Sequence, residues 1–454
     1  MSLFDQSKSP PGDDLQFPSG FLWGVATAAH QVEGNNENQW TAWERAGKIK
    51  SGDLCGAACD WWNNAECDFD LAQELKINAL RLSVEWSRVE PEQGRFDATA
   101  LARYRQMLQG LHRRGIEPFV CLHHFSNPLW FEQQGGFLNP EAPSRFQQFT
   151  ERVVAVLGDL CNRWVTFNEP NVYATLGYVT GEFPPGRKGE VGTALKVMTA
   201  MARAHALAYR TIHESHSQAE VGWAQHYVVF QPVGGVLDGW IAGIQSQIFN
   251  EGFFQLLENG RFSFPLSLGA QAVPEVRGAC DFVGLNVYSR FHVTFDLKSA
   301  GQLFGRVFVP DEAPQGDCGM EKPFGEAFPG GIRNAVKRAS RMEKPIYILE
   351  NGVPDAKDRV RPWLIVNVVQ EMYKLIQEGQ PIRGYFHWTL TDNFEWAEGW
   401  NLRFGLVALD PVTQKRTLRP SAYLYREIIH RNGLSKEMIG QYPLPNSVSA
   451  PWQP

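Results

Sequence analysis

Eight short, mostly apolar segments recur along nearly the whole chain of 454 residues, and stretches with helical periodicity separate them. Apolar runs without polar alternation are typical of strands covered on both faces, as in a parallel sheet flanked by helices. The most economical arrangement is an α/β fold with a single (β/α)8 barrel, the TIM barrel. The predicted strands lie at 21–27, 79–86, 117–124, 164–167, 220–229, 281–288, 345–349 and 381–388.

The segments between these strands predict helices that return the chain to the start of the next strand. Helical periodicity is found at 101–114, 143–157, 192–215, 240–258, 331–342, 359–378 and 421–431. No Ser/Gly-rich linker or shift in composition divides this pattern. We therefore predict one catalytic domain, residues 17–454, preceded by a polar, flexible amino-terminal leader, residues 1–16, that contains Pro10, Pro11 and Gly12.

Composition and charge restrict the partners of the chain. Hydrophobic residues make up 43% of the sequence, enough for a large core, and the formal net charge is −6. A nucleic-acid-binding protein needs a basic face to neutralise phosphates, so this charge argues against nucleic acid as a partner. An uncharged small molecule fits better.

The amino terminus lacks the apolar core of a signal peptide, and no apolar run is long enough to cross a bilayer. Seven cysteines, an odd number, favour reduced thiols over a disulfide framework. We therefore expect a cytoplasmic protein without a membrane partner. Cys55, Cys59 and Cys67 lie close in sequence, but their spacing is not that of a zinc ribbon, which favours free thiols over a metal site.

Polar side chains gather where the predicted strands end. Glu350 ends the strand 345–349 and is followed by a turn-forming Asn-Gly pair, and Glu169 and Pro170 end the strand that begins at Trp164. In a (β/α)8 barrel the carboxyl ends of the strands build the active site. The residues that this rule brings into one pocket are Gln31, Arg81, His124, Asn168, Glu169, Asn286, Tyr288, Glu350, Trp388, Glu395 and Trp396.

This set suits a polyhydroxylated ring, because neutral hydrogen-bonding groups and tryptophan surround two carboxyl groups. No glycine-rich phosphate loop follows a predicted strand. Sugar hydrolysis needs one protonated carboxyl group and one ionised carboxylate. A buried arginine must be paired, so we expect Arg81, with Tyr288, to lower the pKa of Glu350. Glu169 is beside neutral Asn168 and faces a second carboxylate, so we expect its pKa to be raised.

Several of these segments carry a resemblance to a known family. The sequence TFNEP at 166–170 and ENG at 350–352 are similar to the acid/base and nucleophile signatures of glycoside hydrolase family 1, the retaining β-glucosidases and their relatives. Further agreement is found at 21–28, 81–88, 284–286, 392–396 and 403–406. The resemblance runs from about residue 17 to about residue 431.

The resemblance implies a role for each matching residue and no metal or other cofactor. Glu350 would attack the anomeric carbon, and Glu169 would serve as the acid and then the base. Asn286 and Tyr288 match a pair that supports the nucleophile, and Trp388 matches a platform under the sugar ring. The positions that match binders of sugar hydroxyl groups are Gln31, His124, Asn168, Glu395 and Trp396.

The implied substrates are small β-glycosides or oligosaccharides. Relatives that act on 6-phosphorylated sugars have a small polar residue where this chain has Glu395, so the resemblance implies unphosphorylated glucosides, galactosides or fucosides. We expect chiefly a β-glucosidase, active in cellulose degradation, with the loop 183–186 on the aglycone side. The oligomeric state does not follow from the sequence.

Two other functions are weighed against this one. A catalytically silent sugar-binding relative would typically lack one carboxylate, whereas Glu169 and Glu350 are both present. A metal-dependent hydrolase would need alternating histidines, but His123 and His124 are adjacent and face opposite sides of their strand. Leu349, where the family usually has threonine, is likewise expected to face away from the pocket.

Overall fold

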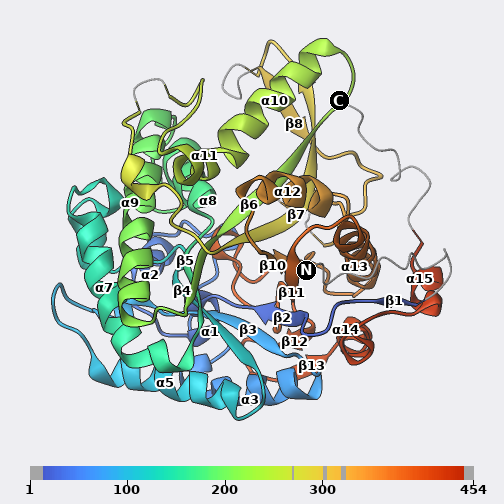
Figure 1. Ribbon diagram of the computed structural model, residues 1–454, viewed down its shortest axis with the longest axis horizontal. Helices are drawn as coiled ribbons and strands as arrows, with labels where there is room; N and C mark the ends of the chain where they lie inside the picture. Colours follow the sequence, from blue (N-terminus) through green and yellow to red (C-terminus); the bar gives the residue numbers. More distant parts are fainter. Residues whose placement is uncertain (1–13, 268–269, 300–303, 318–323, 444–454) are drawn as a thin grey trace, which may run out of the picture.

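The computed structural model describes residues 14–267, 270–299, 304–317 and 324–443. Eight parallel strands form a closed barrel at its centre, surrounded by helices (Figure 1). Pairing between β10 and β7 closes the ring, which confirms the predicted (β/α)8 fold. The barrel strands are β2 (Leu22–Ala26), β3 (Ala79–Ser83), β4 (Glu117–His123), β5 (Arg163–Asn168), β6 (Glu220–Pro232), β7 (Phe282–Phe295), β10 (Ile346–Asn351) and β11 (Ile382–His387).

The helix-like pattern at 69–75 covers only the carboxyl-terminal half of the first long helix. The other predicted segments, except 240–258, agree within a few residues with the long helices. These helices are α3 (Trp61–Glu74), α5 (Ala98–His112), α7 (Ala142–Leu157), α9 (Val191–Ser215), α10 (Val236–Asn250), α11 (Gly252–Asn259), α12 (Gly331–Ala339), α13 (Arg361–Gln377) and α14 (Pro420–Arg431).

The prediction of one helix at 240–258 is wrong, because α10 and α11 are separate. The break falls at Glu251, whose carboxylate pairs with Arg338 at 2.7 Å. Gly252 follows, and a Cβ there would lie 2.8 Å from the sulfur of Met198 of α9, so a larger residue would require the Met198 side chain to shift. Within the described ranges, none of the helices has the length and apolarity needed to span a lipid bilayer.

Shorter elements fill the loops at the two ends of the barrel. The short helices are α1 (Ala29–Glu33), α2 (Gln39–Arg45), α4 (Trp86–Val89), α6 (Leu129–Gln133), α8 (Pro170–Thr175) and α15 (Lys436–Gln441). The short strands are β1 (Leu15–Gln16), β8 (Gly305–Phe308), β9 (Glu326–Ala327), β12 (Val407–Leu409), β13 (Arg416–Leu418) and β14 (Gly433–Leu434).

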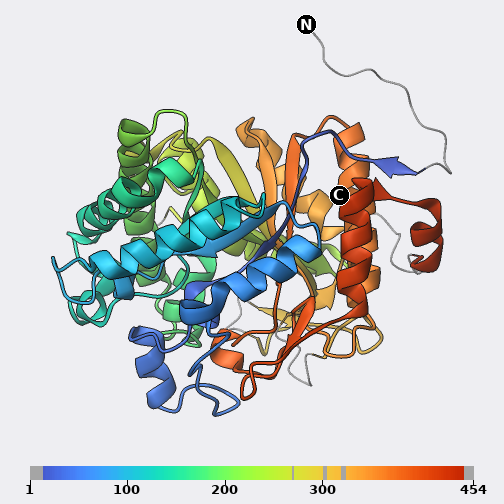
Figure 2. The same ribbon diagram turned by 90° about the horizontal axis from the view of Figure 1, so that it is seen from below.

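The boundary predicted at residue 17 needs a correction. Leu15 and Gln16 form β1, which pairs with β14 in an antiparallel sheet, so the last residues of the expected leader belong to the folded domain. Both ribbon views show β1 beside the carboxyl-terminal helices (Figure 2). Residues 1–13 and 444–454 lie outside the described residues.

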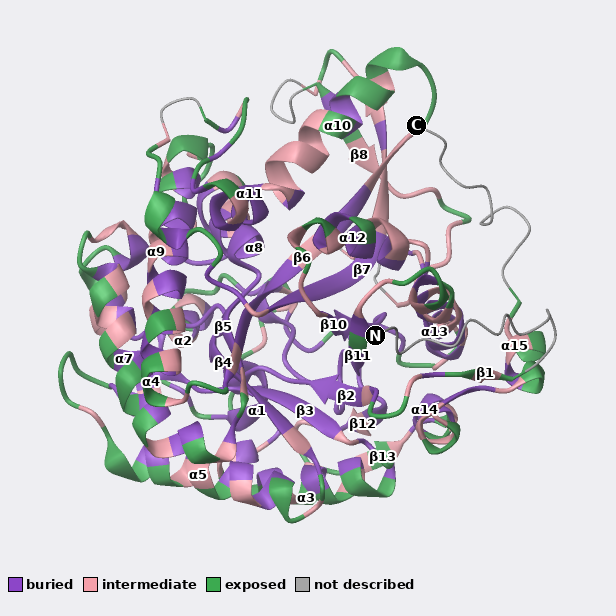
Figure 3. Ribbon diagram, viewed as in Figure 1, coloured by how far each residue is buried: buried purple, intermediate pink, exposed green. Residues whose placement is uncertain are grey.

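Aromatic side chains fill the barrel interior. Phe119 of β4 contacts Phe386 of β11 and Tyr347 of β10, with ring centroids 4.8 and 5.3 Å apart, and Tyr347 also contacts Phe282 of β7. These strands are buried along the barrel (Figure 3). Because this layer closes the interior, a ligand can be held only where the strands end in polar residues.

Two strands are longer than the sequence predicted and leave the barrel. β6 continues to Pro232 and β7 to Phe295, where their extensions pair with each other and β8 adds antiparallel to β7. The helix α10 lies beside them at the top of Figure 1. We call the extensions of β6 and β7, with β8 and α10, the lobe.

Candidate active site

A cavity of about 440 Å³ opens at the carboxyl ends of the barrel strands. Arg81, Asn286 and Gln31 are buried and do not line it themselves. The lobe supplies part of its wall, and Phe183 of the loop 183–186 lines it too. The predicted residues that line the cavity are His124, Asn168, Glu169, Tyr288, Glu350, Trp388, Glu395 and Trp396.

Glu350, near the end of β10, is buried and has two donors. Arg81 of β3 forms an ion pair with it, as the sequence suggested, and the hydroxyl of Tyr288 donates to its Oε2 at 2.5 Å. The expected lowering of its pKa is nevertheless wrong. Burial raises the pKa of Glu350 to about 7, with help from the charge of Glu169 and against the pull of Arg81 and Tyr288. Desolvation of a buried carboxylate therefore outweighs its partners.

Asn168, the last residue of β5, connects the residues around it. Its Oδ1 accepts from Arg81 Nη1 at 3.1 Å and from Asn286 Nδ2 at 3.0 Å. Its Nδ2 must then donate to Nε2 of His124, 2.9 Å away, so Nδ1 of His124 carries the proton. Burial and the charge of Arg81 lower the pKa of His124 well below its usual value. His124 is therefore a neutral donor.

Glu169 follows β5 and stands at the start of α8. Its φ is 48°, a left-handed conformation that is uncommon for residues other than glycine and is often found at functional sites. Its backbone N–H donates to Ala224 O at 2.8 Å, and Pro170 opens the helix behind it. Strand end, strained backbone and helix start together turn the carboxyl group into the cavity.

Asn286 was expected beside the nucleophile, but its bonds run to the other carboxyl group. Its Nδ2 donates to Oε1 of Glu169 at 2.7 Å as well as to Asn168. The two residues of the predicted pair are therefore divided between the two carboxyl groups. Tyr288 contacts Glu350, and Asn286 contacts Glu169.

His226 is the residue of this site that the sequence reasoning missed. Its Nδ1 lies 2.8 Å from Oε1 of Glu169. It falls in the middle of the predicted strand 220–229, whereas the rule for (β/α)8 barrels selects residues at strand ends. β6 runs past the barrel, so its middle is at the barrel rim, where His226 is in register with Asn286. The polar pair Gln225 and His226 inside an apolar run was the available signal.

Glu395 and Trp396 lie in the loop after β11, beside Gln31 of α1. Gln31 Nε2 contacts Oε2 of Glu395 at 3.3 Å and donates to the carbonyl of Phe394 at 2.7 Å. Burial, with the charge of Glu350, raises the pKa of Glu395 well above its usual value. Gln31 and Glu395 form a buried polar corner next to the cavity, which Glu395 lines.

An aromatic wall completes this end of the cavity. The ring of His124 contacts those of Trp396 and Trp388, with centroids 5.7 and 5.9 Å away. Trp396 also packs against Phe125 and Trp40, which fix its position. The wall offers a flat apolar face next to the polar corner, a combination that suits the two faces of a sugar ring.

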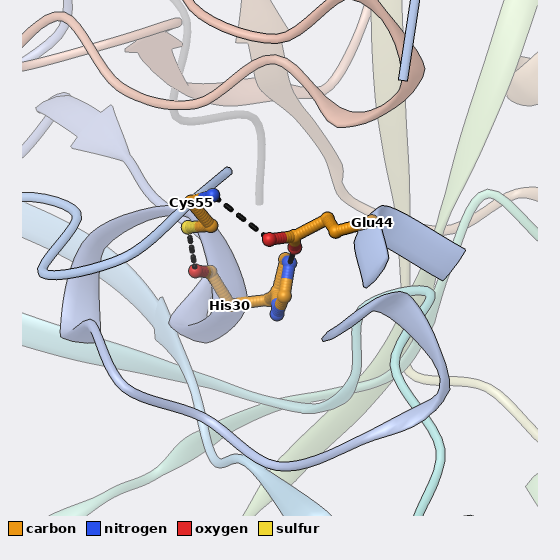
Figure 4. A group of neighbouring side chains, drawn as sticks. All are labelled: His30, Glu44 and Cys55. Carbon is orange, nitrogen blue, oxygen red and sulfur yellow. Dashed lines mark hydrogen bonds and ion pairs between the residues drawn. The ribbon is translucent and has the colours of Figure 1, made fainter. Parts of the chain in front are cut away.

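The cysteine cluster noted in the sequence consists of free thiols, with Cys55 and Cys59 buried and Cys67 exposed. Cys55 lies with His30 and Glu44 in a group of possible metal ligands whose ligand atoms all lie within 4.8 Å (Figure 4). These atoms already have partners. His30 Nε2 contacts Glu44 at 3.0 Å, Glu44 accepts from Cys55 N at 2.8 Å, and Cys55 Sγ donates to His30 O at 3.1 Å.

The arrangement has two carboxyl groups on one cavity, each with its own donors, beside an aromatic wall. Two carboxyl groups that flank one glycosidic bond are the requirement for acid-assisted glycoside cleavage. Fold and site together define the class of the protein as a glycoside hydrolase.

Comparison with known proteins gives the family. The model of glycosyl hydrolase family 1 matches residues 14–434, and the chain belongs to this family. Beta-glucosidase A of Thermotoga maritima is 32% identical over 449 residues, covering 92% of this chain and 99% of its own. The beta-galactosidase of Pyrococcus woesei is 28% identical, covering 93% and 98%.

Solved structures agree with this assignment. The beta-glycosidase from Pyrococcus horikoshii has a TM-score of 0.86 and 35% sequence identity, covering 96% of this chain and 99% of its own. The beta-glucosidase from Thermotoga maritima in complex with castanospermine has a TM-score of 0.87 and 30% identity, covering 93% and 100%.

Proposed function

We propose that the protein is a retaining β-glycosidase, chiefly a β-glucosidase, that removes terminal nonreducing β-D-glucosyl residues and also galactosyl and fucosyl residues by double displacement. One observation carries the proposal. The two carboxyl groups on the cavity have different partners, a guanidinium and a phenol for Glu350 and an imidazole and an amide for Glu169. Different surroundings are what separate a nucleophile from an acid/base.

In the first step, ionised Glu350 attacks the anomeric carbon while Glu169 gives its proton to the leaving oxygen. The bond to the aglycone breaks and an ester bond to Glu350 forms. In the second step Glu169, now ionised, takes a proton from water, and the resulting hydroxide displaces Glu350. The two inversions give net retention, and Glu169 regains its proton.

Binding of the sugar falls to the polar corner and its neighbours. Oε1 of Gln31 and Nδ1 of His124 are buried and have no hydrogen-bond partner within the described residues. A buried polar atom without a partner costs free energy, so a sugar hydroxyl group that pairs with these atoms is stabilised. Asn168, Glu395 and Trp396 would contact further hydroxyl groups, with Trp388 beneath the ring.

The names of the relatives include both glucosidases and galactosidases, which supports activity on both sugars. We infer that the substrates are small β-glycosides or oligosaccharides, among them products of cellulose degradation. We also infer a cytoplasmic location. The six cysteines within the described residues are all free thiols, as expected for a reducing compartment.

The test replaces the nucleophile and supplies another. Glu350→Gly should abolish hydrolysis of an aryl β-glucoside, and azide should restore turnover by entering the space of the carboxylate, giving an α-glycosyl azide. Glu350→Gln, which keeps the side-chain volume, controls for folding by its thermal melting. A β-glycosyl azide would reverse the two roles, and binding of a β-glucoside without turnover by the wild type would favour the silent sugar-binding alternative. Turnover lost with a chelator would indicate a metal-dependent reaction.

A further inference from the structure

His226 contacts Glu169 directly and is connected to Glu350 through Tyr288. Its Nδ1 lies 2.8 Å from Oε1 of Glu169, and its ring stacks on Tyr288 with centroids 5.8 Å apart and planes 17° apart. Tyr288 in turn donates to Glu350. Phe249 of α10 packs against the imidazole in a T-shaped arrangement, with centroids 5.8 Å apart. Two aromatic rings and the contact with Glu169 therefore restrict the position of the imidazole.

The contact also distinguishes the two oxygens of Glu169. Asn286 donates to Oε1, the same oxygen that His226 approaches. No hydrogen bond joins Oε2 to any other described residue. Oε1 is thus engaged by two neighbours, and Oε2 is the oxygen that can give a proton to the leaving group and later take one from water.

The charges around the imidazole favour its protonated form. The titratable groups that face it are Glu169 from the end of β5, Tyr288 from β7 and Glu350 from β10. Burial lowers the pKa of His226, but attraction and hydrogen bonding to Glu169, with a smaller contribution from Glu350, raise it overall. Lys50, at the far end of the cavity, pairs with Glu398 at 2.6 Å, which offsets its charge.

We propose that His226 is a positioning residue that holds Glu169 by Oε1 and, as an imidazolium, favours the ionised form of Glu169 that activates water in the second step. This inference rests on the proposed double displacement. The charge of His226 assists the second step, which needs ionised Glu169. It slows the first step, because it opposes protonation of Glu169.

Loss of this charge should therefore move one limb of the pH profile of each step, and both limbs in the same direction. Removing a neighbouring cation favours the protonated form of a carboxyl group. The first step needs protonated Glu169, so its alkaline limb should move to higher pH. The second step needs ionised Glu169, so its acidic limb should also move to higher pH.

The experiment compares His226→Asn with the wild type. Asparagine can place a neutral N–H near the position of Nδ1 but carries no charge. kcat/KM for an alkyl β-glucoside, a poor leaving group, reports the first step, and kcat for a dinitrophenyl β-glucoside reports the second. Both limbs should move up by about one pH unit. His213→Asn is the matched control, because His213 pairs with Asp281 at 2.8 Å away from the cavity. It should leave both limbs unchanged.

Two further measurements separate charge from packing. His226→Ala, which removes the hydrogen bond too, should lower kcat at the optimum about tenfold or more, and His226→Asn should recover most of that loss. Azide, which needs no base, should restore kcat of His226→Asn with the dinitrophenyl substrate at acidic pH. Limbs that stay in place, or that move in opposite directions, would overturn the role of His226. A wild type that does not hydrolyse, or that gives an inverted product, would instead overturn the double displacement itself.

Discussion

The two ends of the cavity differ in origin and in chemistry. The inner end is lined by His124, Asn168, Glu169, Glu350 and Glu395, all of them buried, on barrel strands or on the segments that directly follow them. The outer wall consists of Val228, Phe230, Phe249, Phe291, Val307 and Phe324, five of which are only half-buried. Most of the outer wall comes from the lobe.

We expect the inner end to carry out the reaction and the outer wall to determine which leaving group is preferred. At the inner end, hydrogen bonds among residues from several strands hold the polar side chains in place and leave Nδ1 of His124 without a partner among the described residues, so that end can distinguish the hydroxyl groups of one sugar. The outer wall is an apolar surface with few hydrogen-bonding groups. It should therefore bind an apolar aglycone well and a second sugar poorly. Substitutions at the inner end should therefore lower kcat/KM for every substrate, and substitutions in the outer wall should lower it only for substrates whose aglycone contacts the wall.

The largest effect is expected at Glu169. Glu169→Ala should lower kcat/KM for alkyl β-glucosides by about 10²–10⁴-fold, because their leaving groups need the proton. The first step with a dinitrophenyl glucoside, which needs none, should change little, as pre-steady-state release of the phenol can show. Glu182→Ala, at the outer end of the cavity, is the control. Equal losses for good and poor leaving groups would contradict the acid role.

A second comparison uses two glutamates three residues apart. Glu395→Gln at the inner end should lower kcat/KM about 10- to 100-fold for every β-glucoside, because leaving a buried hydroxyl group of the sugar without its partner costs about 1–3 kcal/mol. Glu398→Gln, at the mouth beside Lys50, should change it less than about threefold, because exposed ion pairs contribute little. Similar losses in steady-state kinetics would mean that inner and outer positions do not differ.

The contribution of the outer wall can be measured as the dependence of kcat/KM on chain length in a series of alkyl β-glucosides. Each added methylene that becomes buried should raise kcat/KM about fourfold, equivalent to about 0.8 kcal/mol, until the wall is covered. Phe291→Ser should flatten this dependence, whereas Leu237→Ser, an exposed apolar residue of α10 outside the cavity, should not. If cellobiose is a better substrate than octyl β-glucoside, the wall accepts a sugar and the contrast between the two ends fails.

The smallest effect is a shift in pH dependence. Glu350 must be ionised to attack, so kcat/KM should fall as pH drops below about 7, its raised pKa. Tyr288→Phe removes a hydrogen bond that lowers this pKa, so the acidic limb should move to higher pH by roughly half a unit to one unit. Tyr227→Phe, on the adjacent strand, controls for the loss of a hydroxyl group. A limb that moves to lower pH would contradict the role of the Tyr288 hydroxyl group.

Much of the inner end could be predicted from the sequence because its signals are local. Glu169 and Glu350 each end an apolar run, and a proline or a turn-forming pair follows at once. The (β/α)8 fold then brings all strand ends to one face. The outer wall could not be found in this way, because β6 and β7 were expected to stop at the barrel, and their extensions look like ordinary strand and loop in the sequence.

His226 and the pKa of Glu350 show why the remainder needed coordinates. His226 lies within a strand, and it became a site residue only because β6 extends past the rim. The direction of the pKa of Glu350 depends on the balance between burial and its partners, and the sequence names the partners without giving the burial.

The sequence by itself determined the order of strands and helices, the barrel and the two carboxyl groups, because periodicity and strand ends are properties of neighbouring residues. Only the tertiary structure decided that Asn286 and His226 contact Glu169 and that a lobe forms the outer wall. Such contacts join residues far apart in the chain, so they and the burial that shifts a pKa exist only after the barrel has closed.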